Sequence, residues 1–597
     1  MTSLHKYFNQ NPQKNGAIFF LIFSLLFTEI SAFSLSGSKL NIKDHCDSQI
    51  YCTGELLETI QLSNIYPDSK TFVDLVQRND PDVTLRKFED LMTRTNRKPT
   101  KSELEVFISD AFTNQTELEE WIPPDWNKYP PILSHIQDPK FKIFAKNLND
   151  LWKILARKIK PEVALHPNRH SLIPVENGFI IPGGRFKEFY YWDSYWIIKG
   201  LLLSNMYSTA KGMIKNFVSF VDNYGFIPNG GRVYYLMRSQ PPLLTYMVQT
   251  YVDVTQDYKF VEEILPSLDR EFEYWEKKKT VNVPFKGKNY VMARYYVEDE
   301  GPRPESYRED YKLARNLTRK EDKKELYENL KAGAESGWDF SARWFVSSSN
   351  LGQSARRNIS NIATKYIIPV DLNAYLQRNA KRLSKFHAKF GNFVKSRYYQ
   401  QIAMRYQVGI QTLLWNEKDG IWYDYDMLHK RQRNIFYPSN FAPLYTRSYN
   451  IENRVMYAKR TLNYIKTKNI TSFLGGIPTS LDDTGEQWDF PNAWAPLQSM
   501  VIVGLYLTNY EPAVTLSKEL ATRWLRSNHI GFNEFNEMFE KYDAVKPGFY
   551  GGGGEYVVQS GFGWTNGVIF ELLDIYCTAT SDDNVKVPNV KCRPIPA

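Results

Sequence analysis

The chain has 597 residues, a mass of 69.8 kDa and a formal net charge of +9, with a pI near 8.9. The positive charge is spread along the chain, which disfavours nucleic-acid binding, because proteins that bind nucleic acids concentrate basic residues on one face or helix. A hydrophobic content of 43% with 15% aromatic residues excludes general disorder, and ordinary Gly and Pro contents exclude a collagen-like chain.

The amino-terminal segment has the layout of a secretory signal peptide. Two lysines precede a twelve-residue apolar run, 17–28, and the small pair Ser31-Ala32 follows it. The run is shorter than the roughly 20 apolar residues that a membrane span needs. We therefore predict a signal peptide over residues 1–32 and a secreted, extracellular protein that is free of the membrane once the leader is removed. An uncleaved anchor is the alternative.

Two further features are typical of exported proteins. Four sequons, at which glycans attach in secreted proteins, predict a glycoprotein and lie at Asn114, Asn316, Asn358 and Asn469. The four cysteines lie near the ends of the chain, at Cys46, Cys52, Cys577 and Cys592. This placement suits disulfide bonds in an oxidising compartment. Local pairing is the simplest expectation, although three pairings are possible and four free thiols remain an alternative.

From about residue 130 onward the hydrophobic spacing is helical. The expected helices are 141–159, 196–221, 243–252, 260–275, 372–386, 398–415 (centred on Met404 and Val408), 497–507, 516–524 and 568–576. Strand-like runs are few and short, at 290–297 and 421–425. Residues 33–130 are more charged and less periodic, which predicts an N-terminal extension packed on the main body. We therefore expect an all-α protein with one large helical domain over residues 131–576 and a C-terminal tail over 577–597.

The segments between these helices combine Gly and Pro with aromatic and charged side chains. The clearest examples are IPGGRFKEFYYWDSYW, GFIPNGGRVYYLMRSQPP, GPRPESYRED, AESGWDFSARW, GEQWDFPNAWAPLQ and EKYDAVKPGFYGGGGEYVVQSGFGWTNG. Ordinary loops do not gather Trp, Arg and carboxylates together, so these segments are the candidates for function.

Several catalytic classes are missing from the sequence. His is scarce at eight residues, and neither a zinc motif HExxH, a phosphate loop GxxxxGK[ST] nor a nucleophile elbow GxSxG occurs. We therefore predict no metal site. Carboxylates in aromatic loops remain, and these suit glycosidic cleavage, in which one acid protonates the leaving oxygen while a second carboxylate activates water or attacks carbon. The candidates, among which spacing does not choose, are Asp193, Glu305, Asp339, Asp489, Glu540 and Glu555.

Three of these segments carry a family resemblance. PGGRFKEFYYWDSYW (182–196) and QWDFPNAWAP (487–496) resemble the two signatures of the trehalases of glycoside hydrolase family 37, and GGGGEY (551–556) is a third match. The resemblance extends over about residues 130–576. The CDSQIYCTGELL stretch is similar to secreted animal members of the family, especially insect ones. The sequence departs from the family at Gly231, where IPNGGR stands in place of the IPNGNR of bacterial members; the departure touches no residue to which a role is assigned.

The resemblance implies a fold, a reaction and a set of site residues. The fold is an (α/α)6 toroid barrel with its long functional loops at one end, and the reaction is the inverting hydrolysis of α,α-trehalose to two glucose molecules without a cofactor. The general acid is expected at Asp339 and the general base at Glu540. The expected substrate contacts are Arg185, Trp192, Asp193, Asn229, Arg238, Ser239, Gln240, Arg303, Glu305, Gly337 and Glu555.

The chemistry of the residues agrees with these roles. Trp338 and Phe340 flank Asp339, and apolar neighbours would raise the pKa of a carboxylic acid and keep it protonated. Arg185, Arg238 and Arg303 offer planar, fork-shaped donors for hydroxyl groups and carboxylates. Trp192 and Trp488 suit packing on sugar faces, with core packing as the alternative. The glycines at 551–554 suit either a loop that closes over the substrate or a structural turn.

Two other functions stay open at this point. One is a related (α/α)6 hydrolase that acts on another small glucoside. The other is a secreted trehalose-binding protein without turnover, which the presence of both expected catalytic carboxylates disfavours. The oligomeric state and the pH optimum cannot be deduced from the sequence.

Overall fold

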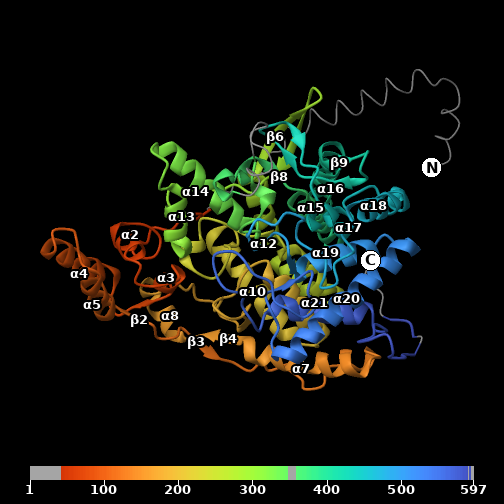
Figure 1. The fold of residues 1–597 in the computed structure, drawn as a ribbon, viewed down its shortest axis with the longest axis horizontal. Coiled ribbons are helices and arrows are strands. Elements are labelled where there is room, and N and C mark those ends of the chain that lie inside the picture. The colour runs from red at the N-terminus through yellow and green to blue at the C-terminus, as the bar shows by residue number, and fades with distance from the viewer. Residues whose placement is uncertain (1–41, 347–357, 589, 593–597) are drawn as a thin grey trace. The chain divides into compact units, whose positions relative to one another are not determined.

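The computed structural model describes residues 42–346, 358–588 and 590–592, and helices dominate these residues (Figure 1). The predicted leader, 1–32, lies outside the described residues. Among the residues that the structure describes, no helix is long and apolar enough to cross a membrane.

Six helices pack one against the next in a closed circuit. In the order of their contacts they are α9 (Asp193–Leu203), α11 (Leu244–Thr255), α15 (Val370–Lys389), α17 (Ala442–Thr446), α19 (Ala495–Tyr506) and α21 (Gly563–Ile575), after which α21 returns to α9. α19 is buried at every position from Ala495 to Leu505, as is typical of a helix that is apolar all round and enclosed by others. These helices therefore form the centre of the domain.

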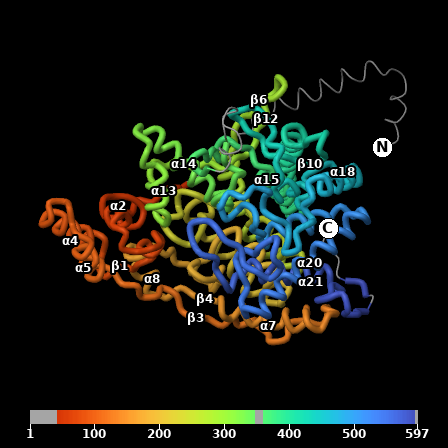
Figure 2. Tube along the Cα trace, viewed as in Figure 1, coloured from red at the N-terminus to blue at the C-terminus, as the bar shows by residue number. Residues whose placement is uncertain are grey.

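Other helices cover this circuit from outside. They are α7 (Pro139–Leu155), α10 (Tyr207–Tyr224), α12 (Tyr258–Lys278), α16 (Phe393–Gly409), α18 (Arg454–Lys468) and α20 (Glu511–Phe535). α7 shows why they form: Asp138 caps its first turn, Pro139 occupies the first helical position, and one apolar stripe faces inward. α7 lies beside α20 and α21 (Figure 2). In its inward stripe, Phe144 packs against Phe532 of α20 at 5.3 Å between ring centroids.

Most expected helices are present, with three corrections. The run 196–221 is divided into α9 and α10. The helix expected to reach Ile159 ends at Leu155, because the chain continues as a strand that pairs with its neighbours. In α16, Met404 and Val408 are 58% and 50% exposed, so the buried face is the opposite one, with Tyr399, Ile402 and Tyr406.

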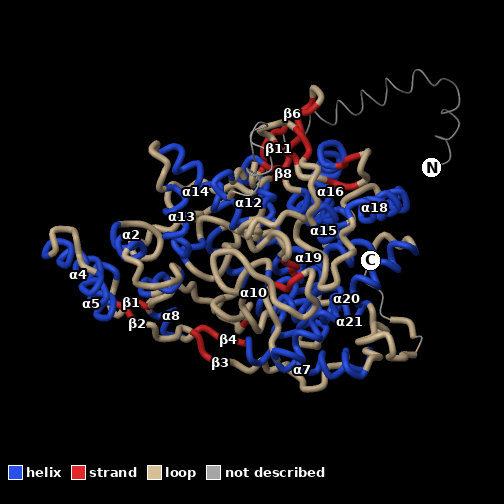
Figure 3. Tube along the Cα trace, in the orientation of Figure 1, coloured by secondary structure: helices blue, strands red, loops and turns tan. Residues whose placement is uncertain are grey.

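The fold is not purely helical, and its strands are drawn in red in Figure 3. Within the described ranges, fourteen short strands form six small sheets. All pairs are antiparallel. The strands are β1 (Val76–Gln77), β2 (Phe112–Thr113), β3 (Leu118–Glu120), β4 (Ala156–Ile159), β5 (Phe179–Ile180), β6 (Thr280–Phe285), β7 (Lys288–Ala293), β8 (Ile367–Ile368), β9 (Trp415–Asn416), β10 (Ile421–Trp422), β11 (Tyr425–Asp426), β12 (Arg431–Gln432), β13 (Asn492–Trp494) and β14 (Lys541–Asp543). Their hydrogen bonds join the long connecting segments to one another. The β13–β14 pair matters most for the site, because Trp494 and Glu540 at its end line the pocket described below.

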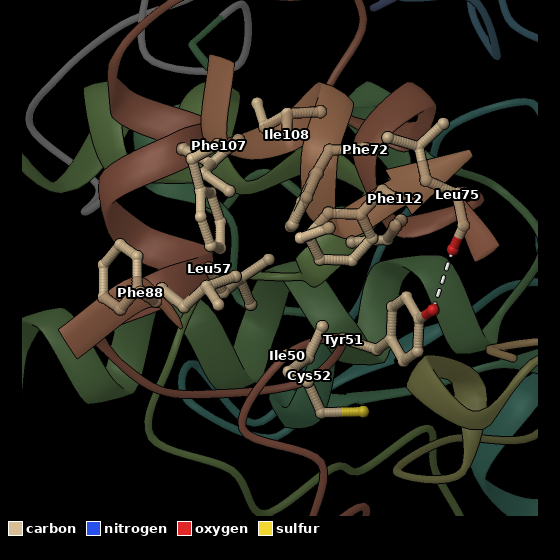
Figure 4. Packing of buried hydrophobic residues seen from close by; sticks show 14 of the residues in the cluster. Ile50, Tyr51, Cys52, Leu57, Phe72, Leu75, Phe88, Phe107, Ile108 and Phe112 are labelled. Atoms are coloured by element: carbon tan, nitrogen blue, oxygen red, sulfur yellow. Dashed lines mark hydrogen bonds between the residues drawn. The ribbon is translucent and has the colours of Figure 1, made fainter. Parts of the chain in front are cut away.

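Residues 42–130 have a hydrophobic cluster of their own (Figure 4). It joins α2 (Glu55–Leu62), α3 (Lys70–Val73), α4 (Pro81–Arg94) and α5 (Lys101–Ala111), and Tyr190, Tyr234 and Tyr235 of the main body belong to it as well. In Figure 4 the hydroxyl of Tyr51 donates a 2.8 Å hydrogen bond to the carbonyl of Leu75. The helices that remain, α6 (Ile132–His135), α8 (Pro161–Leu165), α13 (Tyr307–Ala314) and α14 (Lys320–Glu335), connect these parts.

The cysteines form two disulfide bonds, Cys46–Cys52 and Cys577–Cys592. This is the local pairing among the three that the sequence allows. The four sequon asparagines are all exposed, as glycan attachment requires.

Candidate active site

A polar pocket lies at the amino-terminal ends of the central helices. Trp192, Trp494 and Phe562, which line it, directly precede α9, α19 and α21. The cavity among these residues has a volume of about 80 Å³. Four of the long connecting segments meet here because they lead into the central helices α9, α11, α19 and α21, which gathers residues distant in the sequence around one space.

The structure brings nearly all the expected site residues to this pocket. Those that line it are Arg185, Trp192, Asp193, Asn229, Arg238, Gln240, Arg303, Glu305, Gly337, Asp339, Glu540 and Glu555. Ser239 does not line it: its hydroxyl donates to the carbonyl of Ile227, and its backbone N–H donates to Glu335. Asp489 does not line it either, because its carboxylate accepts hydrogen bonds from Ser341, Ala342 and Thr484. Both are buried residues that hold neighbouring segments in place.

Asp339 lies in the loop after α14, deep in the pocket. Burial raises the pKa of its carboxyl to about 7, with Arg303 opposing the shift and Glu555 adding to it. Its backbone is held from the next segment, since Gln487 Nε2 donates a 2.5 Å hydrogen bond to the Asp339 carbonyl. The neighbouring Trp338 stacks on Trp488 at 5.4 Å between ring centroids. Near neutral pH this carboxyl therefore still carries a proton in a large part of the molecules.

Glu540 directly precedes β14 and is fixed at several points. Its N–H donates to the carbonyl of Gln559 at 2.9 Å, and its own carbonyl accepts from Trp564 Nε1 at 3.1 Å. Tyr556 donates a 2.9 Å hydrogen bond to Oε1. Within the described chain, the buried Oε2 atom has no hydrogen-bond partner. Burial raises the pKa of Glu540, while Lys541, Tyr556 and Arg185 act in the opposite direction.

Asp193, the first residue of α9, is another buried acid of the pocket. Burial raises its pKa well above the usual value, and the charges of Glu540 and Asp339 raise it further. This environment favours the protonated form of the Asp193 carboxyl, which can donate a hydrogen bond. Just before it, the backbone N–H of Trp192 donates to Gln240 Oε1 at 3.1 Å.

Arg303 is buried and joins two carboxylates. Its guanidinium donates to Asp310 through Nε and Nη2, at 3.0 Å and 2.7 Å, and Nη2 also reaches Glu555 at 2.7 Å. The other oxygen of Glu555 accepts a 2.9 Å hydrogen bond from Ser306. Burial raises the pKa of Glu555, and Arg303 opposes this effect. The pair ties the 303–310 segment to the glycine-rich loop, and the Glu555 side chain remains 25% exposed.

Arg238 and Arg185 complete the set of cations. Arg238 donates to Glu305 at 2.5 Å and to Asn229 Oδ1 at 3.0 Å. Burial alone would raise the pKa of Glu305, but Arg238 and Arg303 together bring it below the usual value, so Glu305 is ionised. Arg185 donates to Asp68 at 2.7 Å and lies over the ring of Tyr556 at 4.6 Å. In the part of the chain that is described, Arg185 Nε, Arg238 Nη1 and Glu305 Oε2 are buried atoms without partners.

Gly337 and the run 551–554 have structural reasons to be glycine. Gly337 has a φ of +77°, and a Cβ atom there would lie 2.6 Å from Cζ2 of Trp192. At Gly553 the φ is +76°, and a Cβ atom would meet the carbonyl of Gly485 at 2.4 Å. Because only glycine permits such close approach, the loop packs directly on the QWDFPNAWAP segment and carries Glu555 and Tyr556 into the pocket.

Sequence reasoning missed several lining residues, of which Lys70 and Tyr556 matter most. Lys70 comes from the N-terminal extension and forms a 2.9 Å ion pair with the buried Glu188. No local pattern marks it, because its place depends on the packing of α3. Tyr556 does have a signal, since it ends the GGGGEY match and directly follows Glu555. The pocket is further lined by Pro182, Phe186, Tyr190, Tyr235, Ser306, Ala334, Trp488 and Trp564.

A metal site was not expected from the sequence. Over the described ranges, no group of three or more His, Cys, Asp or Glu side chains is placed to hold a metal ion. The pocket instead offers carboxyls, guanidinium groups and indole rings, which suit an uncharged ligand rich in hydroxyl groups.

Comparison with known proteins decides the family. A sequence model described as "Trehalase" matches residues 64–577. The chain belongs to the trehalase family. Among its relatives, the trehalase of Pimpla hypochondriaca is 52% identical over 95% of this chain and 97% of its own length. The trehalase of Apis mellifera is 50% identical over 89% of this chain and 84% of its own length.

A solved trehalase-family structure shares the fold. The neutral trehalase Nth1 of Saccharomyces cerevisiae superposes with a TM-score of 0.53 at 24% identity, over 66% of this chain and 73% of its own. The family match begins at residue 64, earlier than the position near 130 at which the sequence resemblance was placed. Part of the N-terminal extension therefore belongs to the family's common sequence, in agreement with the contacts of Asp68 and Lys70 at the pocket.

Proposed function

We propose that this protein hydrolyses α,α-trehalose to two glucose molecules with inversion at the attacked carbon. The observation that carries the proposal is that Asp339 and Glu540, 201 positions apart in the sequence, line one buried pocket in a chain of the trehalase family. Glycosidic hydrolysis needs a proton donor and a carboxylate acting on opposite sides of the scissile bond.

Asp339 is the proton donor in this mechanism. Its pKa of about 7 keeps it protonated at mildly acidic pH, so it can pass a proton to the bridging oxygen as the bond to the attacked carbon breaks. The glucose that leaves keeps the α configuration, because its own anomeric bonds are not broken. After the reaction the Asp339 carboxylate is charged, and Arg303 stabilises that charge.

Glu540 is the general base. Tyr556 holds Oε1, which leaves Oε2 to accept a proton from a water molecule that attacks the anomeric carbon from the opposite face. The attacked glucose therefore leaves as the β anomer. An inverting enzyme needs roughly 6.5–9.5 Å between the two carboxyls to admit that water, and we expect this separation between Asp339 and Glu540.

The polar atoms without protein partners suit the substrate. Arg185 Nε and Arg238 Nη1 are donors and Glu305 Oε2 is an acceptor, all buried at the pocket. Sugar hydroxyls both donate and accept, so they satisfy such a set, and an unsatisfied buried polar group is costly. Asn229, Gln240 and Glu555 are proposed as further substrate contacts, and Trp192 and Gly337 shape the wall. No cofactor takes part in this mechanism.

The same proposal includes the fold and the location of the protein. The closed circuit α9–α11–α15–α17–α19–α21, with outer helices packed around it, supports an (α/α)6 toroid. A signal peptide, secretion and glycosylation are supported by the pattern of residues 1–32, the two disulfide bonds and four exposed sequons. Disulfide bonds persist in oxidising compartments.

Anomer-resolved product analysis tests the function. Purified protein mixed with trehalose should release α- and β-glucose in equal amounts. The two anomers are measured by NMR at early times, before mutarotation mixes them. Formation of α-glucose alone would indicate a retaining mechanism, and binding of trehalose without any glucose would indicate a binding protein. Faster hydrolysis of another small glucoside in a disaccharide panel would reassign the substrate.

Substitutions test the two catalytic assignments. Asp339→Asn and Glu540→Gln should each lower kcat by about 10²–10⁴-fold while leaving the thermal unfolding midpoint near that of the wild type. Glu537→Gln, an exposed carboxamide substitution three residues from Glu540, is the matched control and should keep full activity. Wild-type turnover in either catalytic variant would remove that residue from the mechanism.

A further inference from the structure

A group of basic side chains lies on one face of α15, away from the catalytic pocket. Arg378, Lys381, Arg382 and Lys385 are spaced three and four residues apart, which places them side by side on the helix surface. None of the four lines the pocket at the other end of the central helices. A row of four like charges destabilises a helix unless something neutralises it.

Neighbouring elements add cations to the group. α17 packs against α15, and Arg447 follows the last residue of α17 (Figure 1). Burial and then Arg378 lower the pKa of Arg447, and Arg454, the first residue of α18, lowers it too. Burial lowers the pKa of Lys381. The positive charges of its neighbours lower it further, those of Arg378, Lys385, Arg382 and Arg447. These six side chains, which we call the α15 basic cluster, therefore share one electrostatic environment.

Opposing charge is sparse around the α15 basic cluster. Asp253, near the end of α11, is the carboxylate that acts on Arg382 and Lys385. The Asp253 carboxylate also accepts a hydrogen bond from the side-chain amide of Gln249. In the residues that the structure covers, no ion pair or hydrogen bond is made by the side chains of the cluster, in contrast to Arg343, whose guanidinium is bracketed by Asp371 and Asp424.

Buried donors without partners lie in the same place. Arg382 is only 8% exposed, and its Nε atom has no partner among the described groups; the same holds for Nε of Arg447 and the hydroxyl of Tyr246. Burial raises the pKa of Tyr246, and the charges of Arg378 and Arg382 oppose this effect. Unsatisfied buried polar atoms are rare in native proteins, and an unassigned ion is one of the few explanations for them.

The helix dipole does not account for this arrangement. Cations are stabilised by the carbonyl end of a helix only within its last turn. Arg378 and Arg382 lie eleven and seven residues before Lys389, the last residue of α15, which at about 1.5 Å per residue is well outside that turn. Burying a charge without a partner costs several kcal/mol, so an anion bound here would stabilise the buried guanidinium of Arg382.

We propose that the α15 basic cluster binds a divalent tetrahedral oxyanion, phosphate or sulfate, either free or as the ester group of a larger molecule. Arg382 and Arg447 each offer a buried Nε donor, and Arg378 lies one helical turn before Arg382. Lys381 and Lys385 are exposed and add charge at the rim. Guanidinium groups favour such anions because their planar fork matches two oxygens at once. This site is separate from the proposed hydrolysis, and neither depends on the other.

Calorimetric titration of the full-length protein with inorganic phosphate and sodium sulfate tests the site, at ionic strength held constant with chloride. The wild type should bind one anion per chain, and saturating phosphate should raise its unfolding midpoint. Arg382→Gln should weaken binding at least ten-fold. This variant also removes an unpaired buried charge, so its unfolding midpoint in chloride alone should equal or exceed that of the wild type. If Arg382 had only a structural role, the midpoint would fall instead.

A second variant and a control keep the test independent of Arg382. The exposed pair Lys381→Gln/Lys385→Gln should weaken binding without affecting the fold. Arg397→Gln, an exposed substitution on α16, should bind like the wild type. Glycerol phosphate in place of phosphate identifies the source, since tighter binding of the ester assigns the site to a phosphoryl group of a larger molecule. No heat with either ion, or equal affinity in the Arg382→Gln and Arg397→Gln proteins, would overturn the proposal.

Discussion

Tyr556 donates a 2.9 Å hydrogen bond to Oε1 of Glu540, from the loop that the run Gly551–Gly554 carries into the pocket. The same tyrosine ring lies 4.6 Å from the guanidinium carbon of Arg185. A chain of contacts therefore runs from Asp68 in the N-terminal extension through Arg185 and Tyr556 to the proposed general base.

Replacing Tyr556 by Phe tests this relationship. The hydrogen bond lowers the pKa of Glu540, so its loss should raise that pKa and move the acidic limb of the kcat/KM profile to higher pH. Loss of one hydrogen bond to a charged group, worth about 1.5–3 kcal/mol, should lower kcat by roughly ten- to hundred-fold. Tyr550→Phe, at a half-exposed ring in the same loop, is the control and should change neither quantity. An unshifted acidic limb in Tyr556→Phe would exclude this positioning role.

The pH dependence of the wild type should report Asp339. Because the acid must be protonated and its pKa is about 7, kcat/KM should fall as the pH rises through about 7. The Asp339→Asn protein should lose this alkaline limb when assayed with α-D-glucosyl fluoride, whose fluoride leaves without a proton. A limb that persists in that variant would belong to another group.

Asp68→Asn tests the contribution of the N-terminal extension. The substitution keeps the shape of the side chain but removes the charge that holds Arg185, so KM for trehalose should rise. The Asp68 side chain is 37% exposed, and an ion pair of this kind is worth up to about 1 kcal/mol, so the expected change is at most about five-fold. Asp82→Asn, which breaks the exposed pair with Arg86, should leave KM unchanged.

Gly337→Ala tests the contact between the loop after α14 and Trp192. Both Gly337, at φ +77°, and Gly287, at φ +74°, have a left-handed backbone, but a Cβ atom at Gly287 would meet nothing within 4 Å. Alanine at either position should cost about 1–3 kcal/mol of unfolding free energy through backbone strain. Only Gly337→Ala should also displace Trp192 and lower activity. Equal kinetics in the two variants would show that the indole contact is not needed.

The sequence by itself determined the family, the mainly helical class and most of the pocket. Helical spacing located five of the six central helices but not the short α17. The aromatic, glycine-rich segments indicated where carboxylates and arginines would meet. Local cysteine pairing was the simplest of the three pairings that the sequence allows, and the structure has it. Periodicity failed in α16, where Met404 and Val408 mimic a buried stripe yet face the solvent.

Only the tertiary structure decided how each carboxylate is positioned and how burial and neighbouring charges shift its pKa. Asp489 and Asp339 both follow a tryptophan, yet Asp489 is turned toward Ser341 and Ala342 while Asp339 lines the pocket. Lys70 and Asp68 reach the site through the packing of α3, which no local pattern reveals. The physical reason is that a pKa depends on burial and on charges contributed by segments hundreds of residues away, and both are set when the chain closes around the pocket.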